Sequence, residues 1–509
     1  MPKRKTIIIG SGFSGLSAAC FLAKAGEEVI VLERHEQPGG RARQLKASGY
    51  TFDMGPSWYW MPDVFERFFA QFGKQVSDYY QLVRLDPSYK VYWKDDAIDI
   101  PADYGALQQL FERMEKGSAT RLTKFMEGAK FKYETGMNKL VYKPGKSLTE
   151  FADMDLAKGL LKLQVFSSAS KHIRQYFQHP QLIQLLEFPL LFLGALPENT
   201  PALYSLMNYA DMKLGTWYPM GGMYQIVEAM YALAKSLGVT FYFNEEVRKI
   251  EVKDNKATAV LTRQNTFEGD AMVASADYNH VEQHLLDPQY RTYSTNYWDQ
   301  RVMAPSCLIY YIGLNKKLQH IRHHSLFFDV PFEQHGAEIY THPAWPQDPL
   351  FYVCCASQTD DAVAPAGGEN LFILIPVATG MTDDEAIRER YFELAIKRLE
   401  ARLGEAVSSA IVYRRNYAPT DFSNDYSAFK GNAYGLANTL LQTAILKPSM
   451  HSKKVKNLFY TGQLTVPGPG VPPSIISGEI VAREVLKYHV EQGSSIPTNF
   501  KNSPNRLPI

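Results

Sequence analysis

The chain has 509 residues, too many for one compact core, so we expect two or three structural units that share a buried interior. Its 54 Lys and Arg residues nearly balance 53 Asp and Glu residues, which excludes the broad positive surface needed to bind nucleic acid. Four cysteines without CxxC spacing and the lack of an apolar run of ~20 residues predict a reduced cytoplasmic protein without a metal site or a membrane-spanning helix.

Residues 6–33 begin with the pattern of a strand followed by a phosphate-binding loop. Residues 6–9 form a short apolar run that is typical of a buried parallel strand. Gly10, Gly12 and Gly15 then match G-x-G-x-x-G. The first glycine allows a tight turn, the second lets the backbone approach a pyrophosphate, and the third lets the next helix pack closely on the strand.

The second part of this stretch predicts a helix, a strand and an acid that binds ribose. Residues 16–25 are rich in small side chains and predict a helix whose N-terminal amides and dipole face the phosphates, and Gly26 ends it. Residues 29–32 predict the second strand. Glu33 follows this strand, about 20 residues beyond the glycines, where a carboxylate can accept hydrogen bonds from the ribose hydroxyls.

The segment after Glu33 favours FAD over NAD. Residues 38–43 read PGGRAR, a turn that combines flexible backbone amides with the guanidinium of Arg41, which can pair with a second phosphate. This turn resembles the extended FAD signature of the superfamily of flavin amine oxidases and carotenoid desaturases. Residues 50–58, a strand that runs into a Gly-Pro turn, resemble the segment that passes beside the isoalloxazine ring in that superfamily.

The middle of the chain predicts two insertions between the parts of an FAD-binding unit. Residues 76–100 and 291–454 contain strand-like runs, such as 307–314 and 371–377, and predict a mostly antiparallel sheet that floors a substrate cavity. Residues 101–218 predict a helical lid. Within this lid, residues 160–196 face the lipid interface, form a buried helical cap, or do both.

Later stretches resemble the return of the chain to the FAD unit. Residues 218–223, an amphipathic helix and residues 239–247 would bring the backbone of Val247 to the adenine, and residues 271–277 read as the next buried strand and turn. We therefore predict an FAD-binding domain from residues 1–75, 219–290 and 455–490, and a loose tail from residues 491–509.

The C-terminal loop predicts the flavin end of the site. Residues 458–460 read as a strand, Gly462 as a turn at phosphate or ribitol, and Ser474 onward as a helix with prolines at its start. The N-terminus of this helix would direct its partial positive charge at N1 and the C2 carbonyl of the flavin, which stabilises the anionic reduced ring.

With the N-terminal motifs, this loop resembles the carotenoid desaturase family, in particular its bacterial phytoene desaturases. The resemblance covers the whole chain and includes residues 217–222, 357–360, 364–367, 418–422 and 431–434. Val466 and Pro473 depart from it, because the family often has a histidine and a glycine at these places. It implies an α/β, Rossmann-like FAD-binding fold of the glutathione reductase and amine oxidase type, with an antiparallel-sheet substrate domain and the helical lid.

The resemblance also implies the residues that bind FAD and the chemistry. The predicted FAD contacts are Gly10, Gly12, Phe13, Ser14, Gly15, Glu33, Arg34, Gly39, Gly40, Arg41, Gly55, Pro56, Ser57, Val247, Ala276, Gly462, Gly470, Val471 and Pro472. The implied reaction is of the phytoene desaturase type. It introduces conjugated double bonds into a long polyene drawn from a membrane, by hydride transfer to flavin N5 with loss of a proton. A quinone or oxygen would accept the electrons, and the protein would contact the membrane peripherally.

Four residues are candidates for the proton acceptor. The family motifs point first to Asp421, then to Asp360 or to His172 and Arg174 in the lid. Carboxylates beside turns more often cap helices than take part in catalysis.

Several alternatives stay open at this point. A hydroxycarotenoid 3,4-desaturase would have the same fold and differ in its product. A flavin amine oxidase with covalent flavin would need a cysteine near the C-terminus, whereas the last one is Cys355. A carotene isomerase would change geometry without lengthening the chromophore, and a non-catalytic carotenoid carrier would bind pigment without bleaching a flavin.

Overall fold

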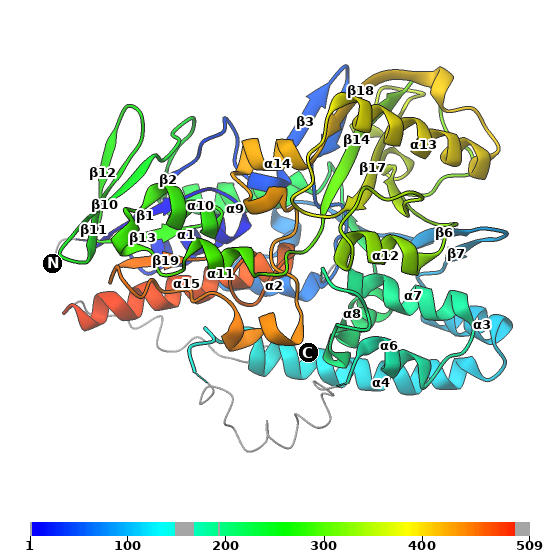
Figure 1. The fold of residues 1–509 in the computed structure, drawn as a ribbon, viewed down its shortest axis with the longest axis horizontal. Coiled ribbons are helices and arrows are strands. Elements are labelled where there is room, and N and C mark those ends of the chain that lie inside the picture. Colours follow the sequence, from blue (N-terminus) through cyan, green and yellow to red (C-terminus); the bar gives the residue numbers. More distant parts are fainter. Residues whose placement is uncertain (1–2, 148–166, 192–193, 494–509) are drawn as a thin grey trace.

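A parallel sheet forms the centre of one side of the molecule (Figure 1). The computed structural model describes residues 3–147, 167–191 and 194–493. The strand order of the sheet is β19-β13-β1-β2-β9, and every pairing is parallel. Its strands are β1 (Lys5–Ile9), β2 (Glu28–Leu32), β9 (Thr240–Tyr242), β13 (Ala271–Ala274) and β19 (Leu458–Tyr460). Strands far apart in the sequence thus join in one sheet, which confirms the predicted Rossmann-like fold.

Two helices cross closely beside this sheet. α1 (Phe13–Lys24) packs against α15 (Val471–Glu491), and α9 (Tyr224–Ser236) also contacts α1. Gly478 makes the close crossing possible, since a Cβ atom there would lie 2.4 Å from the carbonyl oxygen of Ser14. α15 begins at Val471 rather than at Ser474, because its prolines stand in the first turn, where a missing N–H breaks no helical hydrogen bond.

A small antiparallel sheet projects from the same side of the molecule (Figure 1). It consists of β10 (Lys249–Lys253), β11 (Lys256–Leu261) and β12 (Thr266–Glu268), and it connects β9 to β13. The predicted strands at residues 6–9, 29–32, 271–274 and 458–460 are all present.

The second large sheet has seven strands in the order β18-β14-β17-β16-β15-β6-β7. The strands are β18 (Ile411–Tyr417), β14 (Ser306–Leu314), β17 (Glu369–Val377), β16 (Phe351–Cys354), β15 (His324–Phe328), β6 (Tyr89–Trp93) and β7 (Ala97–Ile100). Its pairings are antiparallel except for the parallel pair of β15 and β6. Both predicted insertions contribute strands to this sheet.

The two faces of β14 show how this sheet is packed. Tyr310 and Ile312 share a core cluster with Phe392 of α13 (Glu385–Leu403), which covers the outer face. Ile309 and Tyr311 point the other way, since neighbouring residues of a strand face opposite sides. This inner face lies toward the parallel sheet, and the Tyr311 hydroxyl donates to the carbonyl of Met54 at 2.7 Å.

Helices and short elements complete the fold. The helical part contains α3 (Tyr104–Met114), α4 (Ser118–Thr135), α6 (Ala169–Arg174), α7 (Pro180–Leu191) and α8 (Leu206–Tyr209), with π-helical turns at Gly136–Leu140 and Ala210–Leu214. The shorter elements are β3 (Gln44–Ala47), β4 (Tyr50–Asp53), α2 (Pro62–Ala70), β5 (Leu82–Arg84), β8 (Trp217–Pro219), α10 (Tyr278–His280), α11 (Thr295–Asp299), α12 (Phe332–Tyr340) and α14 (Pro419–Tyr426). Among the described residues, no helix is both long and apolar enough to cross a bilayer.

Two predictions fall partly outside the described ranges. The lipid-facing or buried segment at residues 160–196 includes 160–166 and 192–193, and the predicted tail includes 494–509. Within the described part of that segment, α7 has mostly buried side chains.

Candidate active site

A cavity of about 490 Å³ opens at the carboxyl ends of the parallel strands. Its lining includes the residues that follow β1, β2, β13 and β19, namely Gly10, Glu33, Ser275 and Thr461. Ligands of doubly wound α/β proteins bind at this end of the sheet. All residues predicted to contact FAD line this cavity except Gly15.

The glycine loop after β1 leaves room for a phosphate group. Gly10 has a φ of 97°, which favours glycine. A Cβ atom on Gly12 would meet nothing within 4 Å, and no described side chain caps the N-terminus of α1. The amides of that helix end therefore face open cavity. Gly15 has a packing role, because a Cβ atom there would lie 2.2 Å from the carbonyl oxygen of Gly10.

Glu33 stands at the end of β2 and is held firmly. Its carboxylate accepts hydrogen bonds from the Ser11 amide at 2.9 Å, the Ser11 hydroxyl at 2.6 Å and the His35 amide at 3.0 Å. Val247 lines the cavity nearby, and its backbone makes no hydrogen bond to the described part of the chain. An acid fixed at the ribose position and an unpaired backbone beyond it fit the adenosine half of a dinucleotide.

The Gly-Gly-Arg turn brings a cation to the same loop. A Cβ atom on Gly40 would lie 3.4 Å from the Cα of Gly12, so the two glycine loops are in contact. Arg41 lines the cavity, and its Nε has no hydrogen-bond partner among the described residues. Burial lowers the pKa of Arg41, while the carboxylate of Asp277 acts to raise it. A buried guanidinium with an unused donor fits a pyrophosphate.

The next wall of the cavity lies between the β4 turn and the start of α15. Gly55, Pro56 and Ser57 line one side, and Gly462 with residues 470–472 line the other. Gly55 is required for the turn, because a Cβ atom there would lie 2.4 Å from the carbonyl oxygen of Arg41. Gly470 precedes α15, whose N-terminus has no side-chain cap. An uncapped helix end in a cavity wall fits the electron-rich edge of a flavin.

Beyond Ser57 the lining becomes apolar. Its side chains come from α7, α8, α12 and the inner face of the seven-stranded sheet, and they include Phe188, Met207, Leu326, Phe328, Ile339 and Leu374. The apolar part thus lies between the sheet and the helical part of the molecule. This arrangement can hold a hydrocarbon chain with one section beside the dinucleotide loops.

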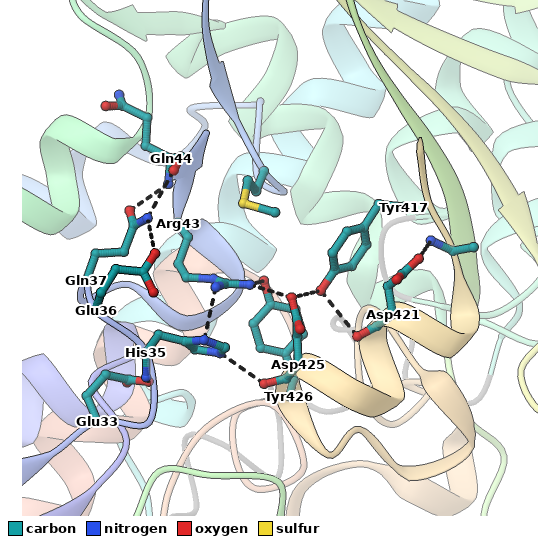
Figure 2. Close-up of polar contacts among 12 residues, drawn as sticks. Glu33, His35, Glu36, Gln37, Arg43, Gln44, Tyr417, Asp421, Asp425 and Tyr426 are labelled. Atoms are coloured by element: carbon teal, nitrogen blue, oxygen red, sulfur yellow. Dashed lines mark hydrogen bonds and ion pairs between the residues drawn. The ribbon is translucent and has the colours of Figure 1, made fainter. Parts of the chain in front are cut away.

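A polar network that the sequence did not reveal closes the cavity at α14 (Figure 2). Arg43 donates to Asp425 at 2.7 Å and to Nδ1 of His35 at 3.0 Å, and Tyr417 donates to Asp425 at 2.8 Å. His35, Asp425 and Tyr426 all line the cavity. The network therefore fixes the loop after β2 against α14, across more than 380 positions of sequence.

The structure places the two predicted catalytic aspartates away from the cavity lining. Asp421 accepts a hydrogen bond from the Ala418 amide at 2.9 Å at the start of α14 (Figure 2). It also pairs with Arg388 at 3.0 Å. Asp360 accepts from the Gly221 amide at 2.6 Å and from the Ala362 amide at 3.0 Å. Both carboxylates stabilise turns, as acids at such positions commonly do.

The two predicted catalytic residues of the lid are also absent from the cavity lining. His172 is buried beside Lys132, whose Nζ lies 3.4 Å from its Nε2, and burial lowers the pKa of His172 to about 4. Arg174 pairs with Glu187 of α7. These contacts hold α4, α6 and α7 together, and a catalytic role for either residue stays a prediction.

Known proteins with related sequences identify the family. A family model described as flavin containing amine oxidoreductase matches residues 13–486. The chain belongs to this family. A carotenoid 3,4-desaturase from Haloarcula japonica is 42% identical over 482 residues, covering 94% of this chain and 97% of the relative. A zeta-carotene-forming phytoene desaturase from Myxococcus xanthus is 29% identical, covering 97% and 96%. Within the family, the chain is a member of the carotenoid desaturases.

A solved structure agrees with this assignment at the level of the fold. Cyclohexylamine oxidase from Brevibacterium oxydans superposes with a TM-score of 0.60 at 13% identity, covering 96% of this chain and 100% of that one. Membership of the carotenoid desaturases makes the protein an FAD-dependent oxidoreductase. The orphaned Arg41 Nε and the open space at Gly12 show that the cavity fits this cofactor.

Proposed function

We propose that this protein desaturates a carotenoid, and that the residues lining the polar part of the cavity hold FAD. The observation that carries the proposal is one continuous cavity, which joins the dinucleotide loops to an apolar section. When bound, FAD would supply the two-electron acceptor, with N5 taking a hydride from the polyene.

The protein itself would bind and orient FAD and the polyene, and would shield both from water. Backbone amides of the loop at Gly12 and the guanidinium of Arg41 would hold the pyrophosphate, Glu33 the ribose and Val247 the adenine. The inner face of the seven-stranded sheet would hold the polyene and exclude water. Gly15 would act through packing, because it lies behind the loop and not on the cavity.

We propose that the new double bond is introduced by 3,4-desaturation, in place of the phytoene-type reaction expected from the motifs. Identity to the Haloarcula 3,4-desaturase is 42%, whereas identity to the Myxococcus phytoene desaturase is 29%. Phytoene-type desaturation is the second candidate, because the match to the Myxococcus phytoene desaturase covers 97% of this chain.

Expression of this chain in two bacterial hosts separates the candidates. One host accumulates phytoene, and the other accumulates a coloured acyclic hydroxycarotenoid. We expect a longer chromophore in the second host and unchanged phytoene in the first, as measured by chromatography with absorption spectra. Coloured products from phytoene would instead establish the second candidate, and unchanged pigments in both hosts would contradict desaturation.

Repeated turnover would need a final acceptor for the two electrons taken from the polyene. We propose a quinone or oxygen as the acceptor, because either takes two electrons and neither requires a further protein site. Turnover by the purified protein without oxygen should resume when a soluble quinone is added. The rate of product formation with and without quinone measures this.

We also propose peripheral contact with a membrane, through a small apolar surface formed by Val302, Leu441 and Leu446. Their exposed fractions are 49%, 78% and 47%, and Gln442 links the segment to the Val302 backbone at 2.9 Å. Exposed apolar side chains of this kind insert into the headgroup region.

Replacing both Leu441 and Leu446 with serine should weaken binding to phospholipid vesicles by about tenfold, a loss of ~1.4 kcal/mol. Co-sedimentation with vesicles measures the bound fraction. Phe131→Ser is the matched control, since Phe131 is 41% exposed but lies on α4. Equal binding by the double variant and the control would count against this surface.

A further inference from the structure

Removal of a proton needs a base at the cavity wall, and the ionisable side chains there are mostly committed elsewhere. Glu33 and Asp425 are held by the loop and network contacts described above. His335 lies in the apolar part, but its Nε2 is 2.9 Å from the Pro376 carbonyl and its Nδ1 accepts from the Leu350 amide at 3.0 Å. Both nitrogens of His335 are therefore occupied, so this imidazole has no lone pair to offer.

Ser57 and Tyr352 offer a different arrangement at the junction of the polar and apolar parts. Both residues line the cavity, and the Tyr352 hydroxyl donates to the Ser57 hydroxyl at 3.0 Å. On its other side, the Tyr352 hydroxyl lies 2.6 Å from Nδ1 of His324. The three groups form a continuous hydrogen-bonded chain from the cavity wall into the protein.

The seven-stranded sheet holds these three hydrogen-bonded side chains in place. In the antiparallel pair of β15 and β16, His324 stands opposite Cys354, and Leu326 opposite Tyr352. The His324 ring stacks on Trp58, with centroids 4.0 Å apart and an interplanar angle of 11°. Trp58 lines the cavity, so His324 lies directly behind a residue of the wall.

His324 is held in its neutral form, so it can take a proton through Tyr352 only transiently. It is fully buried, and burial lowers its pKa well below the usual value, with His323 acting in the same direction. It is thus a neutral imidazole with one basic nitrogen. Its Nε2 has no hydrogen-bond partner among the described residues. Each hydroxyl in the chain can donate and accept, so protons can shift along it in either direction.

A second, smaller cavity lies behind the same wall. It measures about 20 Å³, which is room for one water molecule, and Ser57, His323 and Asp53 are among its lining residues. Ser57 belongs to both cavities. Burial raises the pKa of Asp53 to about 6, against the hydrogen bonds that Asp53 accepts from the Met223 and Tyr224 amides. The Asp53 carboxylate, which lies beside these hydrogen-bonded side chains, can therefore accept the proton in a later step.

We propose that Ser57, Tyr352 and His324 form the proton relay of the desaturation. The inference rests on the proposed function. Once the polyene has lost a hydride, the neighbouring C–H bond breaks and its electron pair becomes the second bond of the new double bond. Rotation about the C–O bond of Tyr352 first turns its hydroxyl hydrogen from Ser57 to Nδ1 of His324. The proton from the polyene then bonds to the Tyr352 oxygen, directly or through Ser57, while the hydroxyl proton of Tyr352 moves to Nδ1 of His324. Because a delocalised carbocation is a strong acid, a hydroxyl backed by an imidazole is a sufficient base.

The test uses the FAD-loaded full chain with Tyr352→Phe and His324→Asn, since the asparagine side chain reproduces the hydrogen bond of Nδ1 but takes no proton. Tyr310→Phe is the matched control, because its hydroxyl donates to the Arg388 carbonyl on the opposite face of the sheet. Anaerobic mixing with the carotenoid is followed by the visible absorption of flavin and polyene. We expect both variants to form product roughly 100-fold more slowly than wild type and the control.

Readouts other than turnover separate the relay from a structural role. We expect FAD content and the spectrum of bound polyene to be unchanged in both variants. Wild type should react more slowly in deuterium oxide, because exchangeable hydroxyl protons move, and Tyr352→Phe should lose this solvent isotope effect. Wild-type rates and isotope effects in both variants would overturn the relay. Failure of wild type itself to react with any carotenoid would instead overturn the proposed function.

One further outcome would also overturn the relay. His323, His324 and Cys354 are buried, with candidate ligand atoms within 4.8 Å of one another. Stoichiometric metal in the purified FAD-loaded protein, lost in His324→Asn, would show that His324 binds a metal ion and not a proton. We expect elemental analysis to find no such metal.

Discussion

Gly12→Val should abolish FAD binding while leaving the fold intact. Gly12 has a φ of −68°, which any residue adopts, and a Cβ atom there meets nothing within 4 Å. The valine side chain would therefore fill the part of the cavity in which the pyrophosphate is expected, without disturbing β1 or α1. We expect affinity for FAD to fall by at least about 100-fold, or ~2.7 kcal/mol.

The flavin absorption per mole of purified protein measures this loss, and circular dichroism reports whether the fold persists. Gly128→Val in α4 is the matched control, since a Cβ atom at Gly128 also meets nothing within 4 Å. The control should keep its full yellow colour. Full FAD content in Gly12→Val would mean that the pyrophosphate lies elsewhere in the cavity.

Lys447→Met should stabilise the protein. The Lys447 side chain is buried, and its Nζ has no hydrogen-bond partner among the described residues. Burial lowers its pKa from 10.5 to about 7. Burying an unpaired ammonium opposes folding, whereas methionine has a similar length and no charge. We expect the free energy of unfolding to rise by about 2–4 kcal/mol at or below pH 7.

The pH dependence follows from the two pKa values of this lysine. Below pH 7 both the folded and the unfolded chain carry the proton, so the full cost applies. Between pH 7 and 10.5 the unfolded chain binds more protons than the folded one, so wild-type stability gains with pH. The advantage of Lys447→Met should therefore shrink between pH 7 and pH 9. Urea unfolding at pH 6 and pH 9 tests this, and an advantage that grows with pH would contradict it.

The glycine turns that line the cavity could be predicted from the sequence because each is encoded locally. Gly10, Gly12 and Arg41 stand in short turns, whose backbone conformation depends mainly on the residues within the turn. The strands at residues 6–9 and 29–32 were predicted from the spacing around these turns, and the family from the resemblance of the motifs, whereas the order of strands in the sheet comes from the structure. The start of α15 was predicted at Ser474 but lies at Val471, because a proline can stand either in the first turn of a helix or just before it.

Candidate proton acceptors could not be chosen from the sequence in the same way. Asp421 and Asp360 stand in family motifs, but short acidic side chains beside turns bind nearby amides, and both do so here. The Arg43–Asp425 pair and the Tyr352–Ser57 contact join residues hundreds of positions apart. Such pairs depend on which strands are neighbours, and the register of β15 and β16 has no local signal in the sequence.

The most direct test of the account is anaerobic mixing of the FAD-loaded protein with a purified acyclic carotenoid. We expect the visible flavin absorption to disappear as the polyene spectrum moves to longer wavelength, with one flavin reduced for each double bond formed. A polyene that binds while flavin absorption stays unchanged would contradict the account, whether or not the geometry of the polyene changes.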